Sequence, residues 1–147
     1  MALRVLAPLD GSETSQKALE NGLRILQGVP EVQVTLFNVT HEGFDGAPAE
    51  MVEQFDRDED DEIFPTRSAS LRMLERTEAL CKGFGVETRS QVVEGKVVDR
   101  ILEACKEHDL LLMHALDKTQ FKENLRGSQA EKIARRAGIA VLLVPYE

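Results

Sequence analysis

The fold of this chain is decided near its amino terminus, where residues 4–12 read RVLAPLDGS. Residues 4–9 form a short apolar run, and the Asp-Gly-Ser turn after them is typical of a strand that leads directly into a helix. Ser12 suits the N-cap of that helix because its hydroxyl can accept from a free backbone amide, and Glu13 favours the positive helix end. The stretch therefore predicts a β-strand followed by an α-helix.

The same alternation continues to the end of the chain. Further apolar runs predict strands at residues 32–39, 86–93, 110–113 and 140–144, and helical spacing predicts helices that begin at Ser12 and near residues 69, 97 and 128. Residues 34–37 are almost continuously apolar, which is typical of a strand covered on both faces. This order predicts a single-domain α/β fold, a doubly wound five-stranded parallel sheet with helices on both faces and right-handed crossovers.

The apolar positions of each helix predict which side faces the core. For the first helix these positions are Ala18, Gly22, Ile25 and Val29, flanked by Leu19, Leu23 and Leu26. For the second they are Leu71, Leu74 and Cys81, and for the third Val97, Val98, Ile101, Leu102 and Cys105. A capping box from Ser128 to Glu131 predicts the start of the fourth helix, and Gly138 its end.

Composition limits the class of protein. The 147 residues suffice for one compact core, and a hydrophobic share of 42% with a charged share of 30% is ordinary for a globular domain. No apolar run approaches the roughly 20 residues of a membrane helix, and the amino terminus lacks the pattern of a signal peptide. The net charge of −8 argues against binding to a nucleic-acid backbone. We therefore expect a cytoplasmic protein whose partners are neither membranes nor nucleic acids.

Residues 41–65 interrupt the rhythm of strands and helices. Glycines and prolines surround an acidic run at residues 56–62, which reads DRDEDDE. A calcium loop needs ligands at fixed offsets around a glycine that this run lacks. We interpret the segment as a solvated loop excursion within one domain that spans residues 1–147.

The two cysteines, Cys81 and Cys105, lack the close spacing of a redox or zinc motif. Both fall on the apolar faces of predicted helices. We expect buried free thiols and no metal site.

Residues 5–15, VLAPLDGSETS, resemble the opening strand and turn of the universal stress protein family. Five further stretches resemble later elements of that family in the same order, namely residues 34–39, 92–95, 109–113, 127–133 and 140–144. The match spans the chain apart from the 41–65 excursion. The resemblance implies a Rossmann-like fold of the adenine nucleotide alpha hydrolase-like type.

The nucleotide-binding branch of the family carries a Gly-x-x-Gly-x9-Gly-Ser/Thr pattern between the fourth strand and the last helix. In this chain those positions are His114, Asp117, Gly127 and Ser128. Gly127 and Ser128 suit an anion site at a helix start. His114 and Asp117 instead add bulk where bare amides must approach phosphate, and Asp117 adds a repelling charge. The resemblance implies a candidate nucleotide site of Asp10, Val39, Gly127 and Ser128, with both leading glycines replaced.

Two alternatives stay open at the level of single residues. The same connection holds three basic residues, Lys118, Lys122 and Arg126. Their positive charges would compensate for the negative charge of Asp117 if they meet phosphates. Asp10 corresponds to a residue that faces the adenosine part in the nucleotide-binding branch, yet an aspartate in an Asp-Gly-Ser turn also caps that turn.

Known catalytic motifs are absent from the sequence. Gly95-Lys96 lacks the upstream glycine of a phosphate-binding loop, and neither H-E-x-x-H nor G-x-S-x-G occurs. We expect no enzyme activity and no required cofactor, with ATP as the ligand if one binds. Two functions remain: a stress-response protein that acts through dimerisation and partner contacts, and an ATP-dependent switch. The replaced glycines favour the first.

The last predicted strand, residues 140–144, carries no charge, and the family resemblance places it at the edge of the sheet. An open apolar edge invites pairing with another chain, and a second copy can cover it across a two-fold axis. Universal stress proteins commonly dimerise through this strand. We expect a homodimer in which Val141 and Leu143, or Leu142 and Val144, supply the contact face.

Overall fold

The structure is a computed structural model, and it describes residues 2–40, 67–114 and 132–144. Its elements are β1 (Leu3–Pro8), α1 (Glu13–Ile25), the 3-10 helix η1 (Leu26–Gly28), β2 (Val32–Thr40), α3 (Arg67–Lys82), β3 (Glu87–Glu94), α4 (Val97–Cys105), β4 (Leu110–His114) and β5 (Ala140–Val144). Residues 132–136 are also helical. The predicted strands are thus confirmed to within a residue or two at their ends. The 41–65 excursion and the capping box at Ser128 lie outside the described residues.

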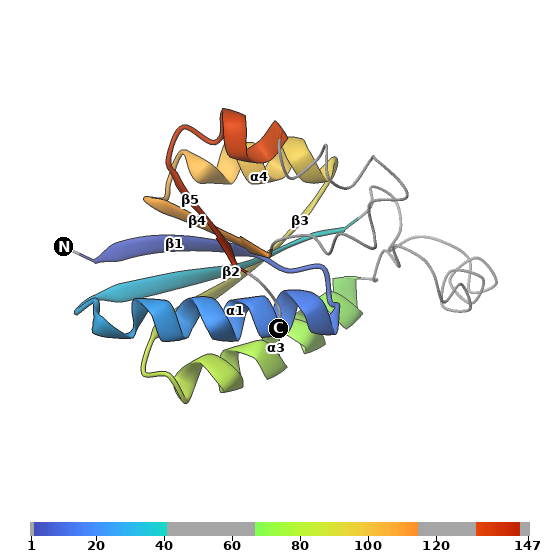
Figure 1. The fold of residues 1–147 in the computed structure, drawn as a ribbon. Coiled ribbons are helices and arrows are strands. Elements are labelled where there is room, and N and C mark those ends of the chain that lie inside the picture. Colours follow the sequence, from blue (N-terminus) through green and yellow to red (C-terminus); the bar gives the residue numbers. More distant parts are fainter. Residues whose placement is uncertain (1, 41–66, 115–131, 145–147) are drawn as a thin grey trace.

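The strands form one parallel, five-stranded sheet in the order β3-β2-β1-β4-β5. α1 and α3 cover one face of this sheet, and α4 with the helix of residues 132–136 covers the other (Figure 1). The doubly wound α/β fold is therefore confirmed. The winding direction changes between β1 and β4, so the carboxyl ends of these two strands form the switch point at which such sheets bind ligands.

The core is divided in two by the sheet, because neighbouring residues of a strand point to opposite faces. Val5 and Ala7 of β1 pack on the side of α1 and α3, whereas Leu6 packs on the side of α4. β2 is buried from Val34 to Asn38, which fits the apolar run in its sequence. Within the described ranges, no helix is long and apolar enough to cross a lipid bilayer.

The buried face of the first helix differs from the predicted one. Ala18, Leu19, Leu23 and Leu26 are buried, whereas Ile25 is 61% and Val29 is 39% exposed. Gly22 lies so close to β4 that an added Cβ would come within 2.5 Å of Leu112 Cδ1. The prediction for Ile25 and Val29 was wrong because two apolar stripes overlap on this helix, and the close approach at Gly22 turns the leucine stripe to the sheet.

The buried face of α3 also differs. It runs through Ser70, Leu74, Thr77 and Cys81, while Leu71, which was predicted to face inward, is 46% exposed. The Thr77 hydroxyl forms its hydrogen bond within the helix, where it donates to the Met73 carbonyl at 2.9 Å. Leu74 and Cys81 are buried as predicted, and hydrophobicity missed the other two inward positions because they are polar. In α4, Val97 is 38% exposed, and Ile101 and Cys105 form the buried side as predicted.

An ion pair joins the amino ends of β1 and β4. Arg4 donates to both carboxylate oxygens of Asp109, from Nη2 at 3.1 Å and from Nε at 3.2 Å, and its backbone amide donates to the same group at 3.0 Å. These hydrogen bonds from the side chain and backbone of Arg4 hold the pKa of Asp109 below its ordinary value.

We expect Arg4→Met to raise the pKa of Asp109 toward the ordinary value of 3.8. The pKa of Asp109 is lower in the folded protein than in the unfolded chain. The stability that this pair contributes is therefore complete above the unfolded pKa, and it is lost as the pH falls through the folded pKa. NMR titration of the Asp109 carboxyl in both proteins measures the change. An Asp109 pKa that is the same with and without Arg4 would contradict the assignment.

Candidate functional site

The turn after β1 brings the predicted residues Asp10 and Ser12 to the switch point. Gly11 has a φ of 85°, a left-handed conformation that side chains disfavour, and it lets the chain pass from strand to helix. Asp10 Oδ1 accepts a hydrogen bond from the Ser12 amide at 2.8 Å. Asp10 therefore caps this turn, which is one of the two roles that the sequence allows.

Ser12 is the N-cap of α1, as predicted. Its Oγ accepts from the Ser15 amide at 3.1 Å, and the Ser15 Oγ donates to the Ser12 carbonyl at 3.0 Å. Ser15 is buried beneath the turn, with 4% of its surface exposed. The first turn of α1 thus supports the backbone that carries Asp10.

Asp10 keeps a negative charge at neutral pH. Loss of hydration is the largest single influence on its pKa and raises it. Hydrogen bonds from the Ser12 hydroxyl and amide, the charge of His114 and the Ser15 hydroxyl together outweigh that influence, so the pKa of Asp10 lies below its ordinary value. The ionised carboxylate suits a ligand hydroxyl or amine and repels phosphate.

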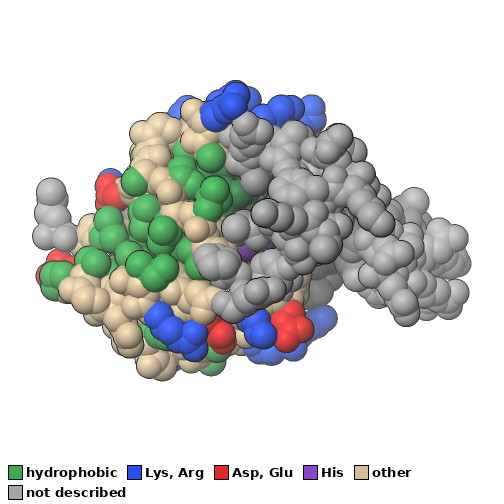
Figure 2. Space-filling model, in the orientation of Figure 1, with side chains coloured by type: hydrophobic (Ala, Val, Ile, Leu, Met, Phe, Trp, Pro, Cys, Tyr) green, Lys and Arg blue, Asp and Glu red, His purple; other side chains and the backbone are tan. Residues whose placement is uncertain are grey.

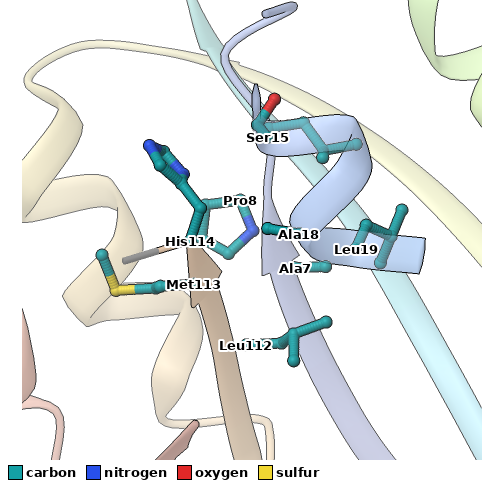
Figure 3. A pocket seen from close by; sticks show the side chains of 9 residues that line it. Ala7, Pro8, Ser15, Ala18, Leu19, Leu112, Met113 and His114 are labelled. Atoms are coloured by element: carbon teal, nitrogen blue, oxygen red, sulfur yellow. The ribbon is translucent and has the colours of Figure 1, made fainter. Parts of the chain in front are cut away.

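His114 is the last residue of β4. Together with Pro8, Leu9, Ser15 and Met113 it lines a small hollow at the carboxyl ends of β1 and β4 (Figure 3). This hollow has room for no more than about one water molecule. His114 therefore places a side chain at the strand end where a glycine would leave the backbone bare.

Val39 lies close to the carboxyl end of β2, where the sequence places it. β2 continues to Thr40, because its ladder with β3 includes the pairs Val39 with Val93 and Thr40 with Glu94. Val39 is thus inside the strand, half-buried in the core cluster beneath α4. Asp117, Gly127 and Ser128 lie outside the described residues. Of the predicted site residues, the described part of the chain places Asp10 and His114 at the carboxyl ends of the neighbouring strands β1 and β4.

A buried polar group that was not predicted supports the turn. Asn38 Nδ2 donates to the Leu9 carbonyl at 2.6 Å, and Ser70 Oγ of α3 donates to Asn38 Oδ1 at 2.7 Å. Asn38 is 1% exposed and Ser70 is 0% exposed. The sequence does hold a signal, an asparagine within an apolar strand, because a buried amide needs hydrogen-bond partners.

Cys81 and Cys105 are free and buried on opposite faces of the sheet, as expected. Desolvation, with a smaller effect of Glu78, raises the pKa of Cys81 to about 11, and burial also raises the pKa of Cys105. Both thiols are therefore protonated and unreactive at neutral pH. In the ranges that the structure describes, no three His, Cys, Asp or Glu side chains are grouped to hold a metal ion.

Comparisons of this chain with known proteins agree on one family. The model of the Universal stress protein family matches residues 1–145. A universal stress protein of Methanocaldococcus jannaschii is 25% identical over 147 residues, covering 96% of this chain and 81% of that protein.

Solved structures are similar along the whole chain. A universal stress protein in complex with cAMP has a TM-score of 0.73 at 21% identity, covering 99% of this chain and 98% of that one. An Arabidopsis thaliana protein of the same family, with AMP bound, has a TM-score of 0.66 at 16% identity, covering 97% of this chain and 91% of that one. At these identities the likeness shows the fold.

Proposed function

Since this chain belongs to the universal stress protein family, we propose that it acts in the stress response by dimerising and contacting partner proteins, without tight ATP binding. The observation that carries the proposal is His114 at the end of β4. In the nucleotide-binding branch of the family, the motif begins there with a glycine.

The surroundings of His114 support weak nucleotide binding. Phosphate loops bring bare backbone amides close to phosphate oxygens, and a side chain at this strand end keeps them apart. The hollow between His114 and Ser15 holds no more than about one water molecule, which is far smaller than a nucleotide. The ionised Asp10 adds a negative charge near the same strand ends.

The two edges of the sheet support dimerisation through β5. β3 exposes the charged residues Glu87 and Arg89, and charged side chains discourage pairing at an edge. β5 has no charged residue, and its Leu143 is 49% exposed. Figure 2 shows hydrophobic side chains gathered on the face where Figure 1 places β5. A partner strand would therefore cover the apolar edge at β5 and not the charged edge at β3, on the opposite side of the sheet.

Burial supports Val141 and Leu143 as the contact face. Val144 is 1% exposed, and Leu142 packs against the core cluster beneath α1, so the fold itself already uses both. Val141 is half-buried and Leu143 is exposed. These two side chains lie on the same face of β5. Val141 packs against the core cluster beneath α4, so Leu143 is the side chain of this face that remains available to a second copy.

The ATP-dependent switch is the second candidate function. Asp10 favours this second function, because its carboxylate lies at the switch point and its lowered pKa keeps it ionised. Two similar structures are described with cAMP and with AMP bound. Contacts between Asp10 and a nucleoside are compatible with His114 if the phosphates extend away from the end of β4.

Three measurements on purified protein test the proposed function. We expect no adenine nucleotide to be released when fresh protein is denatured, and no micromolar binding in calorimetric titration with Mg-ATP. The Arabidopsis relative, titrated with AMP, is the positive control. Light scattering of the same sample should give a dimer. Stoichiometric nucleotide release or micromolar ATP affinity would favour the switch instead.

A further inference from the structure

Leu9, the residue that precedes Asp10, is held on both of its backbone groups by β2. Its amide donates to the Phe37 carbonyl at 2.7 Å, and its carbonyl accepts from Asn38 Nδ2 at 2.6 Å. Leu9 lies one residue beyond the end of β1, so the second contact replaces the ladder bond that a further strand would supply. The position of Leu9 therefore depends on the side chain of Asn38.

The orientation of the Asn38 amide depends in turn on Ser70. The Leu9 carbonyl can only accept, so Nδ2 must face it and Oδ1 must point to α3. There Ser70 Oγ donates to Oδ1 at 2.7 Å. Both side chains are buried away from water, so an amide that turned around would place two acceptor oxygens together. The Leu9 carbonyl thus selects the amide orientation, and the Ser70 hydroxyl holds the amide in that place by donating to its Oδ1.

We propose that Ser70 and Asn38 are positioning residues for Asp10, and that they couple the first turns of α3 to the switch point. The path is short: Ser70 hydroxyl, Asn38 amide, Leu9 carbonyl and then the Asp10 turn, in which Asp10 Oδ1 accepts from the Ser12 amide. The links from Ser70 to Asn38 and from Asn38 to Leu9 are buried hydrogen bonds, and the chain itself joins Leu9 to Asp10. The last contact, between Asp10 and the Ser12 amide, lies at the surface.

This coupling between α3 and Asp10 regulates the same switch-point site that the proposed function concerns. Ser70 lies in the first turns of α3, which begins at Arg67. A partner protein that moves this end of α3 changes how Asp10 is presented, and a ligand held by Asp10 changes the affinity for that partner by the same factor. Only this regulation by a partner rests on the proposed function. The positioning of Asp10 by Asn38 and Ser70 exists in the free monomer.

Removal of one buried hydroxyl tests the positioning. Ser70→Ala deletes the donor to Asn38 with little change in shape. Thr77→Val is the matched control, because it deletes a buried hydroxyl of the same helix that donates to the Met73 carbonyl of α3 itself. Two readouts by NMR follow the site: the pKa of the Asp10 carboxyl, and hydrogen exchange of the Ser12 amide that Asp10 accepts from.

In Ser70→Ala we expect the pKa of Asp10 to rise toward its ordinary value and exchange of the Ser12 amide to become about fivefold faster, as for the loss of one hydrogen bond. Thr77→Val should leave both unchanged. Equal values in Ser70→Ala and the unmodified protein would overturn the proposal, and so would equal changes in the two variants, since these would reflect general loosening.

A second set of variants covers the case in which Ser70→Ala does not fold. Ser70→Cys keeps the size and a weak donor, and it should give intermediate values. In an Asn38→Ala background, the further change Ser70→Cys should have no effect on the pKa of Asp10, because the path is already cut. An additional effect there would also overturn the proposal. None of these measurements needs a ligand or a dimer, so the result stands apart from a failure of the proposed function.

Discussion

Replacing His114 and Asp117 together with glycine is expected to raise the affinity for ATP by about a thousandfold. Two unit charges ~4 Å apart near a protein surface repel by about 4 kcal/mol, which equals roughly a thousandfold in affinity. His114→Gly also removes a side chain from the hollow beside Ser15, so the backbone at the end of β4 becomes accessible to phosphate. Calorimetric titration of both proteins with Mg-ATP measures the gain.

Single variants separate charge from bulk. We expect Asp117→Gly to supply most of the gain and His114→Gly a smaller part. Glu107→Gly is the matched control, because it removes one exposed negative charge at the amino end of β4, away from the switch point, and should leave ATP affinity nearly unchanged. A folded double variant with no gain would mean that something other than the replaced glycines closes the site.

Leu143→Lys is expected to weaken the homodimer by about thirtyfold or more. Leu143 is 49% exposed on the uncharged edge strand β5. Across a two-fold axis the substitution places two ammonium groups in one apolar contact, and the loss of a central apolar contact alone costs roughly 2 kcal/mol. Sedimentation or light scattering at several micromolar concentrations measures the shift from dimer to monomer.

Ile25→Lys is the control for this change. Ile25 is another apolar side chain, 61% exposed at the end of α1, and its replacement should leave the dimer intact. Leu142→Lys is less informative, because Leu142 packs against the core and its replacement would destabilise the fold. A monomer for the unmodified protein at micromolar concentration, or equal effects of Leu143→Lys and Ile25→Lys, would contradict dimerisation through β5.

The elements of the fold were predictable because the patterns that specify them are local. The apolar runs of the strands, the turn at Gly11 and the cap at Ser12 involve residues close together in the chain, and all three are found in the structure. The inward faces of the helices were less predictable. Ile25 and Leu71 are exposed while Ser70 and Thr77 are buried, because what a helix buries depends on what it packs against.

The position of Asp10 at a strand end follows from the sequence alone, and capping the turn is one of the two roles that the sequence allows, since the Ser12 amide that it accepts from is two residues away. The contact of Asn38 with Leu9 spans 29 residues, and that of Ser70 with Asn38 spans 32. The meeting of Asp10 with His114 requires β4 to lie beside β1. Such contacts form only once the strand order β3-β2-β1-β4-β5 has brought distant segments together, and no local pattern encodes that order.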